Sequence, residues 1–138
     1  MSRWLLDTNI ISELRRRDRT NTGVSSWFNP LDENSLFLSV VTIGEIRKGI
    51  ERLRPRDPHQ ALVFDQWLNE LKSSYADRIL PIDTPIVETW GNLQAIRPVP
   101  TIDAFLAATA ICHDLTLVTR NTPDFAELGI HLLNPFSK

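Results

Sequence analysis

Short apolar runs along this chain alternate with longer segments whose apolar residues recur at helical spacing. A short apolar run bounded by turn residues is typical of a buried strand, and recurrence every three or four residues is typical of an amphipathic helix. The pattern predicts strands over residues 5–6, 35–42, 78–83, 115–119 and 129–135. It predicts helices over residues 10–17, 43–53, 61–71, 85–96, 102–113 and 123–128, with Thr42 and Thr101 as N-caps of the second and fifth. Because strands and helices alternate, we expect a parallel sheet covered by helices on both faces. No linker or repeat divides the chain, so we expect one domain over residues 1–138.

Four acidic residues stand where predicted strands end or where the following helices begin. Asp7 directly follows the first strand, and Glu45 lies in the first turn of the helix after the second. Asp103 comes two residues after the predicted cap at Thr101, and Asp124 follows the fourth strand. Since the carboxyl ends of parallel strands lie along one edge of the sheet, we expect these four side chains to converge there.

A cluster of carboxylates is unfavourable without a cation, because like charges raise one another's pKa values. The three histidines, His59, His113 and His131, are scattered, and Cys112 is the only cysteine. A ligand set made of oxygen atoms suits a hard cation such as Mg²⁺ or Mn²⁺. Such an ion lowers the pKa of a bound water and stabilises a phosphodiester transition state, so the residues indicate metal-assisted phosphodiester hydrolysis.

Most of these acids also have a purely structural explanation. Glu45 stands three residues after Thr42, which is the spacing of a capping box. Asp103 is favourable at a helix N-terminus through the macrodipole, and Asp124 fits ordinary turn chemistry. Asp83 also ends a strand, but it is better explained as the N-cap of a helix that starts with proline, and we leave it out of the site.

Basic residues are unevenly distributed although the net charge is only −2. Ten of the fifteen Lys and Arg residues lie in the first 60 positions, together with eight acids. They form two clusters, namely Arg15, Arg16, Arg17 and Arg19, and Arg47, Lys48, Arg52, Arg54 and Arg56. Each cluster is either a solvated helix face or a patch that contacts phosphate groups.

Three long motifs resemble one known family. These are "LLDTNIISEL" at residues 5–14, "SVVTIGEIRKGI" at 39–50 and "TIDAFLAATAICHDLTLVTRNTPDF" at 101–125. Together they resemble the PIN-domain ribonucleases, specifically the VapC-like toxins of bacterial type II toxin–antitoxin systems. The resemblance implies a three-layer α/β/α fold with a five-stranded parallel sheet, and Mg²⁺- or Mn²⁺-dependent endonucleolytic cleavage of RNA.

The resemblance also implies roles for individual residues. Asp7 and Asp103 would be the principal metal ligands, and Glu45 would complete the acidic pocket. The fourth acidic position departs from part of the family, because position 121 is Asn121 here; we therefore favour Asp124 as the fourth catalytic acid. The supporting polar groups would be Thr8, Asn9, Thr119 and Asn121.

The family further implies a cognate antitoxin protein, a homodimer, and a structured RNA such as tRNA or rRNA as substrate. The alternative is a catalytically degenerate PIN-fold module that binds an antitoxin or RNA, and a module of that kind need not bind Mg²⁺ or Mn²⁺. A haloacid-dehalogenase-like phosphatase would need an acid at position 9, where this chain has Asn9. We expect no membrane span, because no apolar run is long enough. The N-terminus has no signal-peptide pattern, so we expect a cytoplasmic protein.

Overall fold

The computed structural model describes residues 2–137 and contains one parallel β-sheet. Its five strands lie in the order β3-β2-β1-β4-β5, so the direction of strand addition reverses between β1 and β4. The strand bounds are β1 Trp4–Leu6, β2 Leu36–Ser39, β3 Ile79–Leu80, β4 Thr116–Val118 and β5 Leu132–Leu133. A ligand site in such a sheet is expected at the carboxyl ends of the strands on either side of that reversal.

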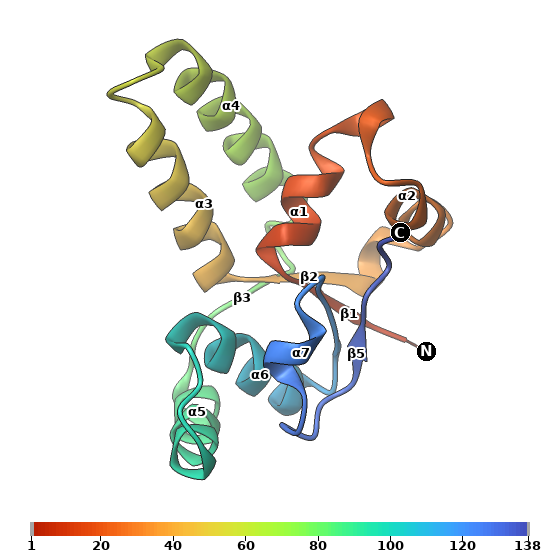
Figure 1. Ribbon diagram of the computed structural model, residues 1–138, viewed down its shortest axis with the longest axis vertical. Coiled ribbons are helices and arrows are strands. Elements are labelled where there is room, and N and C mark those ends of the chain that lie inside the picture. Colours follow the sequence, from red (N-terminus) through yellow and green to blue (C-terminus); the bar gives the residue numbers. More distant parts are fainter. Residues whose placement is uncertain (1, 138) are drawn as a thin grey trace.

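Helices cover both faces of this sheet (Figure 1). Helices α1 to α4 lie on one side and α5 and α6 on the other. The helix bounds are α1 Thr8–Leu14, α2 Thr22–Phe28, α3 Val40–Leu53, α4 Pro58–Ser74, α5 Thr84–Ile96, α6 Thr101–His113 and α7 Thr122–Phe125. Short 3₁₀ turns span Arg17–Arg19 and Glu33–Ser35. The expected three-layer α/β/α fold with a five-stranded parallel sheet is confirmed.

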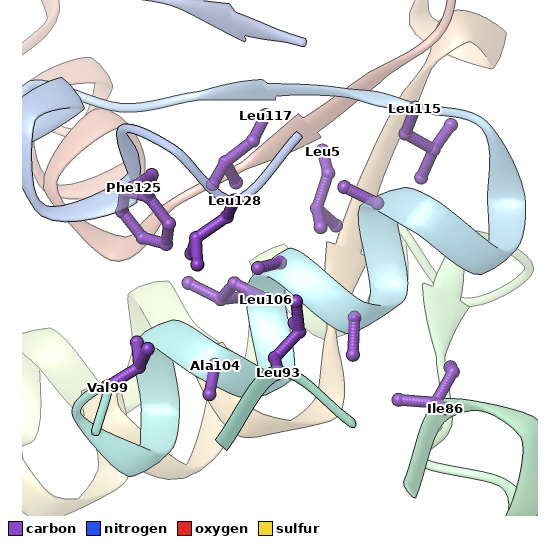
Figure 2. Close-up of a cluster of buried hydrophobic side chains, with 13 residues drawn as sticks. Leu5, Ile86, Leu93, Val99, Ala104, Leu106, Leu115, Leu117, Phe125 and Leu128 are labelled. Atoms are coloured by element: carbon purple, nitrogen blue, oxygen red, sulfur yellow. The ribbon is translucent and has the colours of Figure 1, made fainter. Parts of the chain in front are cut away.

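Two hydrophobic cores form because neighbouring residues of a strand face opposite sides of the sheet. Leu5 of β1 and Leu117 of β4 pack with α5 and α6 (Figure 2). Leu6 and Val118, one position further along the same strands, pack with α1, α3 and α4. All four side chains are fully buried. Burial on both faces explains why the central strands β1 and β4 are mostly apolar, without strict alternation of apolar and polar residues.

The boundary between β2 and α3 differs from the expectation. The strand ends at Ser39, and α3 already begins at Val40. The backbone N–H of Val41 donates to the Ser39 hydroxyl at 3.1 Å, so Ser39 is the N-cap and Thr42 lies inside the helix. The β-branched run from Val40 to Thr42 has strand propensity, but the serine cap decides the local structure.

Two other local predictions were wrong, and one helix was missed. Thr101 is the first residue of α6, and the N-cap position belongs to Pro100, which has no capping side chain. Helix α1 ends at Leu14, before Arg17 adopts a positive φ of 55°. Helix α2 was not predicted, because residues 22–28 include glycine and several poor helix formers. Its N-cap, Asn21, accepts hydrogen bonds from two backbone N–H groups of that helix.

Over residues 2–137, none of the helices combines the length and the apolar character that a membrane crossing requires.

Candidate active site

Asp7 is the first residue after β1 and lies at the point where the strand order reverses. Its backbone N–H donates to the carbonyl of Val118 at 3.0 Å, which continues the pairing of β1 with β4 by one residue. Its side chain is the N-cap of α1 and accepts the Thr8 backbone N–H at 2.7 Å. The side chain is therefore held at the carboxyl edge by both the strand and the helix, and Asp7 is only 6% exposed.

The hydrogen-bond partners of the Asp7 carboxylate are neutral groups. Besides Thr8, the Thr119 hydroxyl donates to Oδ2 at 2.8 Å and the Asn9 amide donates to Oδ2 at 3.3 Å. Among residues 2–137, no basic side chain forms an ion pair with this carboxylate. Burial raises the pKa of Asp7, the charge of Glu45 raises it further, and the three hydrogen bonds only partly oppose the shift.

Asn9 and Thr119 connect the loops that follow β1 and β4. The Asn9 amide donates to the Thr119 hydroxyl oxygen at 3.3 Å, and its carbonyl oxygen accepts the Arg120 backbone N–H at 3.1 Å. The same hydroxyl oxygen accepts the Asn121 backbone N–H at 3.0 Å. Thr8, Asn9 and Thr119 therefore form one network around Asp7, and Asn121 joins it through its backbone N–H.

Glu45 lies in the second turn of α3 and is half-buried. Its Oε1 accepts the Thr8 hydroxyl at 2.7 Å, which joins α3 to the start of α1. Because the N-cap is Ser39 and Thr42 lies within the helix, the capping-box explanation of Glu45 is wrong. Ser39 was missed as a positioning residue, although a serine at the end of an apolar run is a recognised helix-start signal.

Asp103 lies in the first turn of α6 and is half-buried. Its pKa is raised to about 6, first by burial and then by the negative charges of Asp7, Asp124 and Glu45. The other three acids are therefore close enough to Asp103 to act on it electrostatically. Asp103 also lies in the first turn of α6, so a favourable interaction with the helix dipole stays a structural alternative for this residue.

The fourth acidic position involves Asn121 and Asp124. Asp124 lies in the first turn of α7 and is exposed, and its backbone N–H donates to the carbonyl of Asn121 at 3.1 Å. Asn121 occupies the N-cap position without a side-chain capping bond. Asp124, and not Asn121, carries a charge that raises the pKa of Asp103. This arrangement agrees with the preference for Asp124, whose catalytic role stays a prediction.

The acids at the carboxyl edge offer oxygen donors for a divalent cation. Within residues 2–137, no three His, Cys, Asp or Glu side chains are grouped so that they could hold a metal ion. Mg²⁺ commonly binds one or two carboxylates and completes its octahedron with waters and substrate phosphates. Asp7 and Asp103 supply hard oxygen donors, and burial and neighbouring charge raise the pKa of each. The residues therefore fit a cation that keeps much of its water better than one enclosed by protein ligands.

The basic clusters are partly neutralised by ion pairs. Arg47 lies in α3, and Arg54 is the C-cap of that helix. Both arginines pair with Glu51 of α3 and with Asp65 of α4. Arg16 pairs with Glu13. For Arg47 and Arg54 the structure favours a role in joining α3 to α4 over a role in contacting phosphate, whereas the ion pair of Arg16 is local.

Comparison with known proteins identifies the family. Residues 4–130 match the PIN domain. The chain is 34% identical to the plasmid stability protein StbB of Pseudomonas syringae pv. tomato, covering 96% of this chain and 97% of the relative. It is 28% identical to the VapC ribonuclease Y4jK of Sinorhizobium fredii, covering 96% of each.

Solved structures give the same result. The FitAcB structure from Neisseria gonorrhoeae aligns with a TM-score of 0.85 at 31% identity, covering 96% of this chain and 97% of that chain. A toxin–antitoxin complex from Klebsiella pneumoniae aligns with a TM-score of 0.70 at 27% identity, covering 97% and 98%. The chain belongs to the PIN-domain family, and its resemblance to the VapC-like members is confirmed.

Proposed function

We propose that this protein is a metal-dependent endoribonuclease and the toxin of a toxin–antitoxin pair. The observation that carries the proposal is the meeting of four acids at the carboxyl edge, where burial first, and then the charges of Asp7, Asp124 and Glu45, raise the pKa of Asp103 to about 6. Family membership and the similarity to a named VapC ribonuclease support the same activity. The similarity to a toxin–antitoxin complex supports a cognate antitoxin as partner. A homodimer and a structured RNA substrate, tRNA or rRNA, belong to the proposal as well.

The chain's own residues would share the work of hydrolysis. Asp7 and Asp103 would hold Mg²⁺ or Mn²⁺, and such an ion, when bound, stabilises the charge that develops on a phosphodiester in the transition state. Thr8, Asn9 and Thr119 fix the orientation of the Asp7 carboxylate. The Thr8 hydroxyl holds Glu45, whose carboxylate would orient the attacking water and accept its proton.

One observation favours the alternative of a degenerate binding module. Asp7 already serves as the N-cap of α1 and accepts hydrogen bonds from Thr8, Asn9 and Thr119. An aspartate in that position has a structural use even without catalysis. The two functions differ in whether the acids bind a divalent cation.

Metal binding therefore separates the two candidates. A ligand that binds only the folded state at 100 times its Kd adds about 2.7 kcal/mol to the free energy of unfolding. We expect MnCl₂ to raise the melting temperature of the protein by several degrees relative to EDTA, as measured by differential scanning calorimetry. The Asp7→Asn and Asp103→Asn variants should lose most of this shift. Identical melting temperatures for the parent protein in Mn²⁺ and EDTA would favour the binding module.

The fourth position has its own test. We expect Asp124→Asn to lower kcat/KM for RNA cleavage by about tenfold, because it removes a charge that acts on Asp103. Asn121→Ala should have a smaller effect, since the Asn121 side chain makes no capping bond and brings no charge. Single-turnover cleavage of one labelled RNA by both variants gives the order of the two effects. The reverse order would move the fourth position to Asn121.

A further inference from the structure

A basic side chain stands beside the acidic site without forming an ion pair to any part of the chain that the structure describes. Arg120 lies between Thr119 and Asn121 and is exposed. Its backbone N–H donates to Asn9, and Thr119 donates to Asp7, so its backbone is tied to the site on both sides. The residue is thus held at the rim of the carboxylate cluster, while its charge is not cancelled by an acid.

The guanidinium of Arg120 is positioned by an aromatic ring. Its central carbon lies 4.7 Å from the centroid of the Phe136 ring, which is cation–π geometry. A contact of this kind restricts the side chain but leaves its positive charge and its N–H donors available. An ion pair with a carboxylate would have neutralised the charge instead.

The ring is held in turn by a docked segment, residues 134–137. This segment follows β5 and reaches the start of α2, from a distant part of the sequence (Figure 1). The Ser137 backbone N–H donates to the Asn21 side-chain oxygen at 2.9 Å, and the Asn21 amide donates back to the Ser137 carbonyl at 3.1 Å. The Phe136 ring packs against the core on the α1–α4 side of the sheet.

Gly23 permits this docking. A Cβ at position 23 would lie 2.4 Å from the Pro135 carbonyl oxygen and 2.5 Å from the Ser137 backbone nitrogen. Both atoms belong to the backbone of the 134–137 segment and cannot move aside without displacing it. The approach of the segment to α2 therefore requires glycine at this position.

We propose that Arg120 binds a phosphate group of the RNA substrate, and that the docked 134–137 segment positions it through Phe136. This inference rests on the proposed nuclease function and adds a substrate-binding residue to it. Four interacting acids repel a polyanion, so productive binding needs cationic groups next to them. A guanidinium offers a fork of N–H donors that matches the oxygens of a phosphate.

The test measures RNA binding separately from cleavage. All binding variants carry Asp7→Asn so that the RNA is not cut, and the probe is a fluorescein-labelled 20-nucleotide single-stranded RNA in Mn²⁺ buffer at several NaCl concentrations. We expect Arg120→Ala to weaken binding by about tenfold. The slope of log K against log [NaCl] should become smaller in magnitude by about one, which is the change expected when one phosphate contact is lost. Lys72→Ala, which removes an exposed positive charge from α4, is the matched control and should leave both values unchanged.

The positioning role of Phe136 needs a readout that simple loss of stability would not produce. Phe136→Leu keeps an apolar side chain in the core and removes the ring. We expect Phe136→Leu to weaken RNA binding about threefold when Arg120 is present. It should have no effect when Arg120 is already replaced by alanine, because the effects of a coupled pair are not additive. Additive effects would overturn the positioning role.

Two outcomes separate this inference from the proposed function. If the parent protein cleaves RNA but Arg120→Ala retains full affinity and an unchanged salt slope, the phosphate contact is overturned and the nuclease stands. If the protein with Asp7 intact neither cleaves nor binds RNA, both proposals are overturned together.

Discussion

Asp7→Asn is expected to abolish RNA cleavage, by about two orders of magnitude or more, while the protein stays folded. The substitution removes the buried charge that would hold the metal ion. It keeps a side-chain oxygen that can accept the Thr8 N–H, so the N-cap of α1 survives. The measurement is the initial rate of cleavage of one labelled RNA, with circular dichroism to compare the fold.

The chain offers an exposed N-cap aspartate as the control for this change. Asp83 also follows a strand, and it also caps a helix, because its side chain accepts the Ile86 backbone N–H at 3.2 Å. It does not contribute to the raised pKa of Asp7 or of Asp103. Asp83→Asn should therefore cleave RNA at the rate of the parent protein. If the Asp7→Asn and Asp83→Asn variants both cleave RNA at nearly the rate of the parent protein, Asp7 has no catalytic role.

Asp103→Asn is expected to make the metal-free protein more stable at pH 7 and above, at the expense of activity. In the folded state the pKa of Asp103 is raised from 3.8 to about 6. Between pH 3.8 and about 6 the folded state binds a proton at Asp103 more strongly than the unfolded state does. The stabilisation that this proton gives the folded state is therefore present at low pH and is lost as the pH rises through about 6. Above that pH the ionised carboxylate destabilises the fold, and asparagine does not.

The size of this effect is limited by solvent. Asp103 is only half-buried, so water screens its charge and we expect a gain of about 1 kcal/mol, or roughly 3 °C in melting temperature, for the variant in EDTA. Calorimetry at pH 4.5, 6 and 7.5 gives the difference between variant and parent, which should grow with pH. Addition of Mn²⁺ should reverse the order, because only the parent retains both predicted ligands. If the difference in melting temperature between variant and parent shrinks as the pH rises, the pKa of Asp103 is not raised in the folded state.

The placement of Asp7 and Asp103 was predictable because it depends on local patterns. A charged residue directly after the apolar pair Leu5–Leu6 marks the end of a buried strand, and strand ends of a parallel sheet share one edge. A carboxylate at the start of a helical segment is likewise visible in the sequence. These features need no knowledge of long-range packing.

The contacts that complete the site were not predictable in the same way. The hydrogen bond from Thr8 to Glu45 joins residues 37 positions apart, and it exists because Ser39 starts α3 earlier than its strand-forming residues indicate. The network between Asn9 and Thr119 joins residues 110 positions apart. Such contacts depend on the register of β1 with β4, which propensity and periodicity do not fix.

Helix α2 and its docked segment illustrate the same limit more strongly. Gly23 in the sequence reads as a helix breaker, whereas in the structure it is the residue that lets residues 134–137 approach α2. The partner atoms are more than 110 positions away. The positioning of Arg120 by Phe136 follows from this docking and has no local sequence signal.

Cleavage of a mixed tRNA and rRNA pool by the purified protein, free of antitoxin, tests the central claim most directly. Parallel reactions contain Mg²⁺, Mn²⁺ or EDTA, and the products are separated on a denaturing gel. We expect discrete RNA fragments in the presence of either metal and intact RNA in EDTA. Fragments of equal yield in EDTA, or intact RNA in every reaction with folded protein, would contradict a metal-dependent ribonuclease at the four acids.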